Sequence, residues 1–175
     1  MSQYPHQLSG GIKQRICFAM ALMLNPKVLI ADEFTTNLDV TIQAKMMDLV
    51  KDLKNTTHAA ILFITHDLSL ISQTCDRMAI MYAGQIVESG SVKKLFANPM
   101  HPYTVGLINS IPSVKNEDKY VQGIPGSVPS LINPPSGCRF YNRCPHAMRG
   151  KCDISFPAKH EVDSEHMVFC HKYVS

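Results

Sequence analysis

Two short apolar runs, separated by a segment with helical periodicity, constrain the fold of this chain more than any other feature. The runs VLIA (28–31) and AAILFIT (59–65) have the length and composition of strands that are buried on both faces. Between them, apolar residues recur at helical spacing over residues 40–54, and Asp39 is a candidate N-cap. The apolar helical positions are Ile42, Met46, Leu49, Val50 and Leu53. This order predicts an α/β fold with a parallel sheet and helices.

The pattern changes near residue 98. Before that point, LSLISQTCD (68–76) predicts a short helix, and MAIMYAGQIVESG (78–90) predicts two strands around a tight Ala-Gly-Gln turn. Two parallel strands and a hairpin form a small sheet, so we expect an incomplete domain over residues 1–97. Nine of the eleven prolines lie at or beyond Pro99, which indicates a separate, loop-rich extension over residues 98–175.

Composition narrows the class of protein. A hydrophobic content of 45% in 175 residues indicates a globular protein and excludes a disordered one. The net charge of +3 is mild and the basic residues are dispersed, so we expect no nucleic-acid partner. No apolar run approaches the ~20 residues that cross a bilayer, and no secretory leader is recognisable. We therefore expect a cytoplasmic location, at most on a membrane complex.

Acidic and histidine side chains follow the two predicted strands. Asp32 and Glu33 end the first strand, and His66 follows the second. Since the carboxyl ends of parallel strands share one edge of a sheet, we expect these three residues along that edge, where ligands bind. Asp32 could hold Mg²⁺ and Glu33 could polarise a water for attack on a phosphoryl group. Solvated acids and a structural histidine are the competing interpretation.

A serine and two glycines open an amphipathic helix early in the chain. LSGGIKQR (8–15) places Ser9, Gly10 and Gly11 at a helix start, where free N–H groups and the helix dipole suit a phosphate. Taken alone, the motif is more typical of an ordinary loop before a helix.

Together these motifs resemble the ATP-binding cassette (ABC) ATPases over residues 4 to about 95, which implies a P-loop NTPase-like fold. The resemblance implies that a signature motif contacts the γ-phosphate of ATP held by a partner subunit, through Ser9, Gly10, Gly11 and Gln14. It implies that Asp32 is associated with Mg²⁺, that Glu33 is the catalytic glutamate and that His66 is the switch histidine. A loop crossing the dimer interface corresponds to Asn37, Leu38 and Asp39.

Two departures from the family pattern stand out. Phe34 occupies the position where the family usually has proline, so the turn that aims Glu33 differs. No G-x-x-x-x-G-K-[S/T] loop and no glutamine loop occur in the sequence, so the chain looks like the C-terminal portion of such an ATPase. We expect it to be inactive as an enzyme when alone.

Six cysteines divide by position. Cys17 and Cys75 are expected to be small core residues. The remaining four have the spacing C-x5-C-x7-C-x17-C and comprise Cys138, Cys144, Cys152 and Cys170. Four thiols in a proline-rich segment could bind Zn²⁺ or an iron–sulfur cluster, and the spacing does not decide between them. Nearby His146, His166 and His171 are expected to be surface histidines rather than rival ligands.

Residues 98–173 resemble the C-terminal extension of the oligopeptide and dipeptide importer ATPases. The segments that carry the resemblance are NPMHPYTVGLINSIP, GIPGSVPSLINPPSGCRFYNRCPHA and HMVFCHKY. It implies a metal-binding extension with a structural [4Fe–4S] cluster on the four cysteines, with Zn²⁺ as the alternative. It also implies an ATPase on the cytoplasmic face of the membrane that couples ATP hydrolysis to peptide import. The implied partners are a second ATPase subunit, two permease subunits and an extracytoplasmic peptide-binding protein.

Rival hypotheses remain open on the sequence. The chain could be a truncated, catalytically incompetent fragment that binds a partner or carries a metal. A small iron–sulfur electron carrier would leave Asp32, Glu33 and His66 without a use. Nickel importers share the style of the extension, so the cargo could be a metal chelate.

Overall fold

The computed structural model of the chain describes residues 4–35, 39–56, 59–111 and 123–174. It contains two compact units, residues 1–67 and residues 68–175. Within the described residues, no helix has both the length and the apolar character needed to cross a bilayer.

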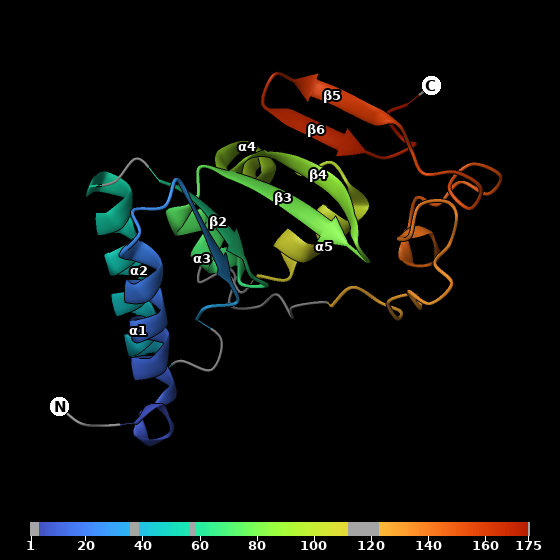
Figure 1. Cartoon of the computed structure of the whole chain (residues 1–175). Coiled ribbons are helices and arrows are strands. Elements are labelled where there is room, and N and C mark those ends of the chain that lie inside the picture. The colour runs from blue at the N-terminus through green and yellow to red at the C-terminus, as the bar shows by residue number, and fades with distance from the viewer. Residues whose placement is uncertain (1–3, 36–38, 57–58, 112–122, 175) are drawn as a thin grey trace, which may run out of the picture. The chain divides into compact units, whose positions relative to one another are not determined.

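The first unit pairs two parallel strands with helices (Figure 1). Its elements are η1 (Pro5–Gln7), α1 (Gly10–Leu22), β1 (Val28–Asp32), α2 (Val40–Thr56) and β2 (Ala60–Ile64). Strands β1 and β2 run parallel in the register Val28↔Ala60 to Asp32↔Ile64. The predicted parallel strands and the helix between them are therefore confirmed. Asp39 caps α2, since its Oδ1 accepts from Ile42 N at 2.8 Å.

The core of the first unit lies where α1 and α2 pack on one face of this strand pair. Phe18, Leu29, Met46 and Val50 are buried in it. Phe18 is the buried residue of α1, whereas neighbouring Cys17 is exposed. The prediction that Cys17 belongs to the core is wrong, because apolar residues surround the whole of α1 and their spacing does not mark one face.

The second unit contains a four-stranded antiparallel sheet in the order β3-β4-β6-β5 (Figure 1). Its elements are α3 (Leu68–Thr74), β3 (Arg77–Tyr82), β4 (Gln85–Ser91), α4 (Val92–Ala97), α5 (Pro102–Asn109), η2 (Tyr141–Arg143), β5 (Lys159–Asp163) and β6 (His166–Phe169). The predicted hairpin is confirmed: Ala83 and Gly84 join β3 to β4 with φ of 48° and 82°. No strand was predicted beyond residue 98, so β5 and β6 are revealed only by the structure.

Gly90 allows the hairpin β5–β6 to join the sheet. It pairs with His166, and a Cβ at this position would lie 2.5 Å from the Glu165 carbonyl oxygen and 2.5 Å from Leu95 Cδ1. Any side chain would therefore force β6 away from β4.

Aromatic rings hold the loop-rich part of the second unit against this sheet. Phe140 is fully buried, and its ring meets that of Tyr82 edge-on at a centroid distance of 5.1 Å. Tyr103 of α5 packs on both rings, at 4.7 Å from Tyr82 and 5.5 Å from Phe140. The segment around Phe140 thus gains order by packing rather than by regular secondary structure.

Candidate functional site

The carboxyl ends of β1 and β2 bring together the polar residues that were expected there. Asp32 is the last residue of β1, opposite Ile64, and Glu33 N donates to the Ile64 carbonyl oxygen at 2.8 Å. His66 follows two residues after Ile64, and its Nδ1 lies 3.3 Å from Glu33 Oε1. Both side chains are exposed, so they are accessible to a ligand in the first unit.

Glu33 has an unusual backbone conformation. Its φ of 42° places it in the left-handed region, which costs a non-glycine residue free energy and is enriched at functional sites. The residue that follows explains how this conformation is held. Phe34 packs its ring against Phe18 at 6.3 Å and Phe63 at 5.7 Å, so the chain turns inward directly after Glu33. Phe34 therefore anchors the turn at the position where proline was expected.

Three residues that were not predicted to have a role support the turn that carries His66. Asp67 N donates to Thr65 Oγ1 at 3.0 Å, and this hydrogen bond closes a tight turn around His66. From α2, Gln43 Nε2 donates to Asp67 Oδ2 at 3.4 Å. The only signal for Gln43 in the sequence is a polar residue in the first helical turn, which is too common to indicate a role.

The residues of the predicted signature motif begin α1. Ser9 is the N-cap with extended backbone, and the described residues supply no capping hydrogen bond from its side chain. Ser9 and Gly10 are exposed, whereas Gly11 and Gln14 are half-buried. A Cβ on Gly10 would meet no atom within 4 Å, so packing within the described structure does not require glycine there. Asn37 and Leu38 lie outside the described residues, and Asp39 caps α2.

The four cysteines of the extension lie in one neighbourhood. Cys138 N donates to the Cys152 carbonyl oxygen at 2.8 Å, and both residues are buried, whereas Cys144 and Cys170 are half-buried. The pKa of Cys138 is raised to about 11, mainly by burial and to a smaller extent by the other three cysteines, while a backbone hydrogen bond at Phe140 opposes the rise. Burial also raises the pKa of Cys144 and of Cys170.

These thiols do not form a metal site in the structure. No group of three or more His, Cys, Asp or Glu side chains is arranged to hold a metal ion anywhere in the ranges that the structure describes. The expected [4Fe–4S] or Zn²⁺ site is therefore not shown.

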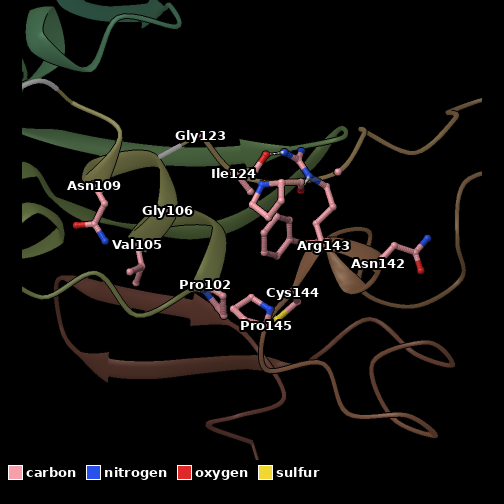
Figure 2. A pocket seen from close by; sticks show the side chains of 13 residues that line it. Pro102, Val105, Gly106, Asn109, Gly123, Ile124, Asn142, Arg143, Cys144 and Pro145 are labelled. Carbon is pink, nitrogen blue, oxygen red and sulfur yellow. Dashed lines mark hydrogen bonds between the residues drawn. The ribbon is translucent and has the colours of Figure 1, made fainter. Parts of the chain in front are cut away.

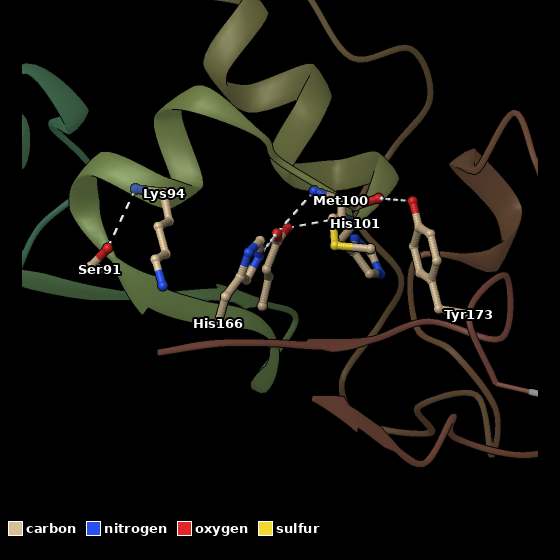
Figure 3. Close-up of polar contacts among 7 residues, drawn as sticks. Ser91, Lys94, Met100, His101, His166 and Tyr173 are labelled. Atoms are coloured by element: carbon tan, nitrogen blue, oxygen red, sulfur yellow. Dashed lines mark hydrogen bonds and ion pairs between the residues drawn. The ribbon is translucent and has the colours of Figure 1, made fainter. Parts of the chain in front are cut away.

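Glu88 of β4 is a fully buried acid. Figure 3 labels three residues that contact it, namely Met100, His101 and His166. Its Oε1 lies 2.7 Å from His166 Nε2 and accepts from Met100 N at 2.9 Å, while its Oε2 accepts from His101 N at 2.8 Å. One carboxylate thus connects β4, β6 and the start of α5. The prediction that His166 is a surface histidine is wrong, because β6 enters the sheet beside β4 and carries His166 to Glu88.

An open pocket of about 580 Å³ lies beside α5 in the second unit (Figure 2). Val105 and Gly106 of α5, Ile124 of the connector and Cys144 form part of its wall. Arg143 donates to the carbonyl oxygens of Ile124 at 2.6 Å and Pro125 at 2.7 Å. Its guanidinium is engaged in fixing the connector, so the pocket presents a mainly apolar wall and no evident catalytic group.

Comparison with known proteins gives matches for both parts of the chain. The family model described as "ABC transporter" matches residues 1–36, and the one described as "Oligopeptide/dipeptide transporter, C-terminal region" matches residues 87–152.

Individual relatives align over nearly the whole chain. The oligopeptide transport ATP-binding protein AppD of Bacillus subtilis is 50% identical over 173 residues, which are 99% of this chain and 52% of AppD. The dipeptide transport ATP-binding protein DppD of Caldanaerobacter subterraneus is 47% identical over 173 residues, or 99% of this chain and 53% of that protein. The oligopeptide transport ATP-binding protein OppD of Salmonella typhimurium is 49% identical over 148 residues, which are 85% of this chain and 44% of OppD. The chain spans about half the length of the curated relatives it matches. These matches confirm the resemblance drawn from the motifs: the chain is a relative of the ATP-binding proteins of ABC-type oligopeptide and dipeptide transporters.

Proposed function

We propose that this chain is part of the ATP-binding component of an ABC importer, which couples ATP hydrolysis to the uptake of peptides. The observation that carries the proposal is the pairing of Glu33 with His66 beside Asp32, at the carboxyl ends of two parallel strands. The names of the relatives support peptides as the cargo.

Each residue of the strand-end site has a role in this proposal. Asp32 would hold the Mg²⁺ that accompanies ATP, and the ion would neutralise charge on the phosphates. Glu33 would polarise the attacking water, and its Oε1 lies 3.3 Å from His66 Nδ1. His66 would contact the γ-phosphate. Ser9, Gly10, Gly11 and Gln14 would contact a nucleotide held by a second ATPase subunit.

The test is ATP-driven peptide uptake by vesicles that contain a complete subunit with Glu33→Gln. Loss of the carboxylate should reduce uptake at least 100-fold, because the variant no longer polarises the water. Glu161→Gln serves as the control, since Glu161 is an exposed acid of β5 paired with Lys159 on the surface. Undiminished uptake with Glu33→Gln would refute the assigned role of Glu33.

A second candidate function is that of a non-enzymatic, partner-binding module. The absence of a G-x-x-x-x-G-K-[S/T] loop from the 175 residues favours it for the chain by itself. ATPase assays on the purified chain discriminate between the two. Robust turnover by the chain alone would exclude the non-enzymatic function.

The proposed surroundings are a second ATPase subunit, two permease subunits and an extracytoplasmic peptide-binding protein at the cytoplasmic face of a membrane. Within the chain, we propose residues 1–97 as the nucleotide-binding portion and 98–175 as the transporter-specific extension. Competition of labelled peptide uptake by unlabelled dipeptides, oligopeptides or a nickel chelate would identify the cargo class.

We also propose a structural metal on the cysteines of the extension, a [4Fe–4S] cluster or Zn²⁺. The chemistry of four neighbouring thiols supports it, although their described arrangement is not that of a ligand set. Metal analysis and an absorption spectrum of anaerobically purified protein test the proposal. A broad visible band with about four iron atoms per chain would indicate the cluster, one zinc without the band would indicate Zn²⁺, and neither would refute a metal.

A further inference from the structure

Three phenylalanine rings pack together beside the turn that carries Glu33. The ring of Phe34 lies 6.3 Å from that of Phe18, with the two planes 19° apart, and 5.7 Å from that of Phe63, with the planes 38° apart. Phe18 belongs to α1 and Phe63 to β2, so the rings join two elements to the residue that follows Glu33. We call Phe18, Phe34 and Phe63 the phenylalanine stack.

The phenylalanine stack connects the core of the first unit to the candidate site. Phe18 is 8% exposed and belongs to the buried core, whereas Phe34 and Phe63 are half-buried and pack against that core. Aromatic rings in contact prefer particular mutual orientations, which aliphatic side chains do not impose to the same degree. The two neighbouring rings therefore hold the Phe34 ring in place, and with it the backbone at position 34.

The backbone of Glu33 is held on both sides. Its N–H donates to the Ile64 carbonyl oxygen at 2.8 Å, and the next residue is Phe34. Between these two anchors Glu33 has a φ of 42°, which a residue other than glycine keeps only when its surroundings impose it. The turn brings Glu33 Oε1 to 3.3 Å from His66 Nδ1. Both side chains are exposed, so their own packing does not impose this arrangement.

We infer that Phe34 is a positioning residue for Glu33, and that Phe18 and Phe63 act on the Glu33 carboxylate through the Phe34 ring. The inference rests on the proposed ATPase function for the chemistry in which Glu33 takes part, whereas the positioning rests on the geometry of the turn. Without a ring at position 34, the turn loses an anchor and the φ of Glu33 returns to less costly negative values. The carboxylate then moves away from His66.

Helix α1 has two tasks in this arrangement. It begins at Gly10 directly after Ser9, and both residues are proposed to contact a nucleotide held by a second subunit. About two turns further along the same helix, Phe18 contacts Phe34. The helix that carries the Ser9 motif is therefore also one of the supports of Glu33 in the same chain.

Phe34→Leu in a complete subunit tests the inference through the kinetics of ATP hydrolysis in vesicles. Leucine keeps an apolar side chain but removes the ring. The variant should lower kcat at least tenfold and change KM for ATP less than twofold, because only the Glu33 carboxylate is displaced and the residues proposed to hold the nucleotide remain. Phe34→Tyr retains the ring and should keep kcat within threefold of the original. Equal losses of kcat with leucine and tyrosine would overturn the role of the ring.

Phe156→Leu is the matched control for removal of a ring. Phe156 is also half-buried, and its ring stacks on that of Phe169 at 5.6 Å in the second unit. The control should change kcat and KM less than twofold. A tenfold loss of kcat in the control as well would ascribe the effect to general destabilisation and would overturn the inference.

The combination of Phe18→Leu with Phe34→Leu tests whether the rings act together. Phe18→Leu should lower kcat in the original subunit, but it should cause no further loss when position 34 is already leucine, because residues that act as a unit are not additive. Losses that multiply in the double variant would contradict the role of Phe18 as a support that acts through Phe34.

Nuclear magnetic resonance of the 175-residue chain gives a readout that does not depend on catalysis. A left-handed φ brings the amide and Cα hydrogens of a residue close together, so Glu33 should show a strong nuclear Overhauser effect between them. Phe34→Leu should weaken this signal at least twofold, whereas Phe34→Tyr and Phe156→Leu should preserve it. An unchanged signal in Phe34→Leu would overturn the inference. Spectral changes throughout the first unit would also overturn it, in favour of a general structural role.

The two readouts separate this inference from the proposed function. A weakened Glu33 signal in Phe34→Leu, with normal hydrolysis in both Phe34→Leu and Glu33→Gln, would refute the catalytic assignment and leave the positioning intact. Loss of hydrolysis in Glu33→Gln, with a normal signal and a normal kcat in Phe34→Leu, would refute the positioning and leave the proposed function intact.

Discussion

At the scale of single residues, the backbone of Glu33 is held in a conformation that glycine and asparagine adopt more readily. Its φ of 42° and the packing of Phe34 on Phe18 and Phe63 fix the turn after β1. The carboxylate is thereby placed near His66 rather than along the strand. The conformation costs folding free energy at a position where the carboxylate is proposed to act.

Replacing Glu33 with asparagine should make the first unit more stable. Asparagine tolerates the left-handed region, so Glu33→Asn should raise the free energy of unfolding by about 1 kcal/mol. Urea unfolding followed by circular dichroism measures this change. Glu33→Ala, which also removes the carboxylate but keeps the unfavourable φ, should give no such gain; an equal gain would mean that backbone strain is not the cause.

His101 gives the second unit a dependence on pH. Burial lowers the pKa of His101 from 6.5 to about 4, and its Nδ1 accepts from Tyr103 N at the start of α5. The unfolded chain binds the His101 proton more readily than the folded chain does. The stability that neutral, buried His101 contributes to the second unit is therefore complete above pH 6.5, and it is lost as the pH falls towards 4. The loss should reach about 3 kcal/mol.

The variant His101→Asn tests this dependence, since asparagine retains an acceptor for the helix cap but does not titrate. Unfolding free energies of both proteins between pH 7 and 4 give the comparison. The original chain should lose more stability than the variant over this range. Parallel pH profiles would show that His101 does not titrate as its burial implies.

At the scale of elements, the hairpin β5–β6 completes the sheet that β3 and β4 begin. Three features hold β6 beside β4. The two strands pair through their backbones, Gly90 leaves the space that β6 needs, and Glu88 contacts His166. A buried carboxylate requires such partners, because an unpaired charge in the interior is strongly unfavourable. The extension therefore shares a core with β3 and β4 and is not an appendage to them.

Gly90→Ala should destabilise the second unit by about 2 kcal/mol, because the added methyl overlaps Glu165 and Leu95 and separates β6 from β4. Thermal unfolding monitored by circular dichroism measures the effect. Gly123→Ala is the control, since a Cβ at Gly123 would meet no atom within 4 Å. Equal stability of both variants would show that β6 adjusts to the methyl group without cost.

At the scale of the whole molecule, the chain holds the strand-end acids of the proposed nucleotide site but no phosphate-binding loop within its 175 residues. We expect the chain alone to bind Mg-ATP with a Kd weaker than about 1 mM, because exposed carboxylates by themselves repel the nucleotide's phosphates. Isothermal titration calorimetry measures this affinity. Tight binding of Mg-ATP by the chain alone would contradict the expectation.

The sequence by itself determined the elements whose signals are local. Strands β1 and β2, helix α2 with its Asp39 cap and the hairpin at Ala83–Gly84 were predicted, since periodicity and turn residues act between near neighbours. The positions of Asp32, Glu33 and His66 at strand ends followed from the same patterns. Their catalytic roles stay predictions.

Only the tertiary structure decided the rest. The left-handed conformation of Glu33 depends on Phe34 packing into the core, and the Glu88–His166 contact joins residues 78 positions apart. Neither leaves a periodic trace in the sequence, because both arise from burial between segments that are distant along the chain. The same reason explains why one face of the β1–β2 pair is exposed. Alternating strand residues look equally buried in the sequence, and only the packing of α1 and α2 on one side distinguishes the two faces.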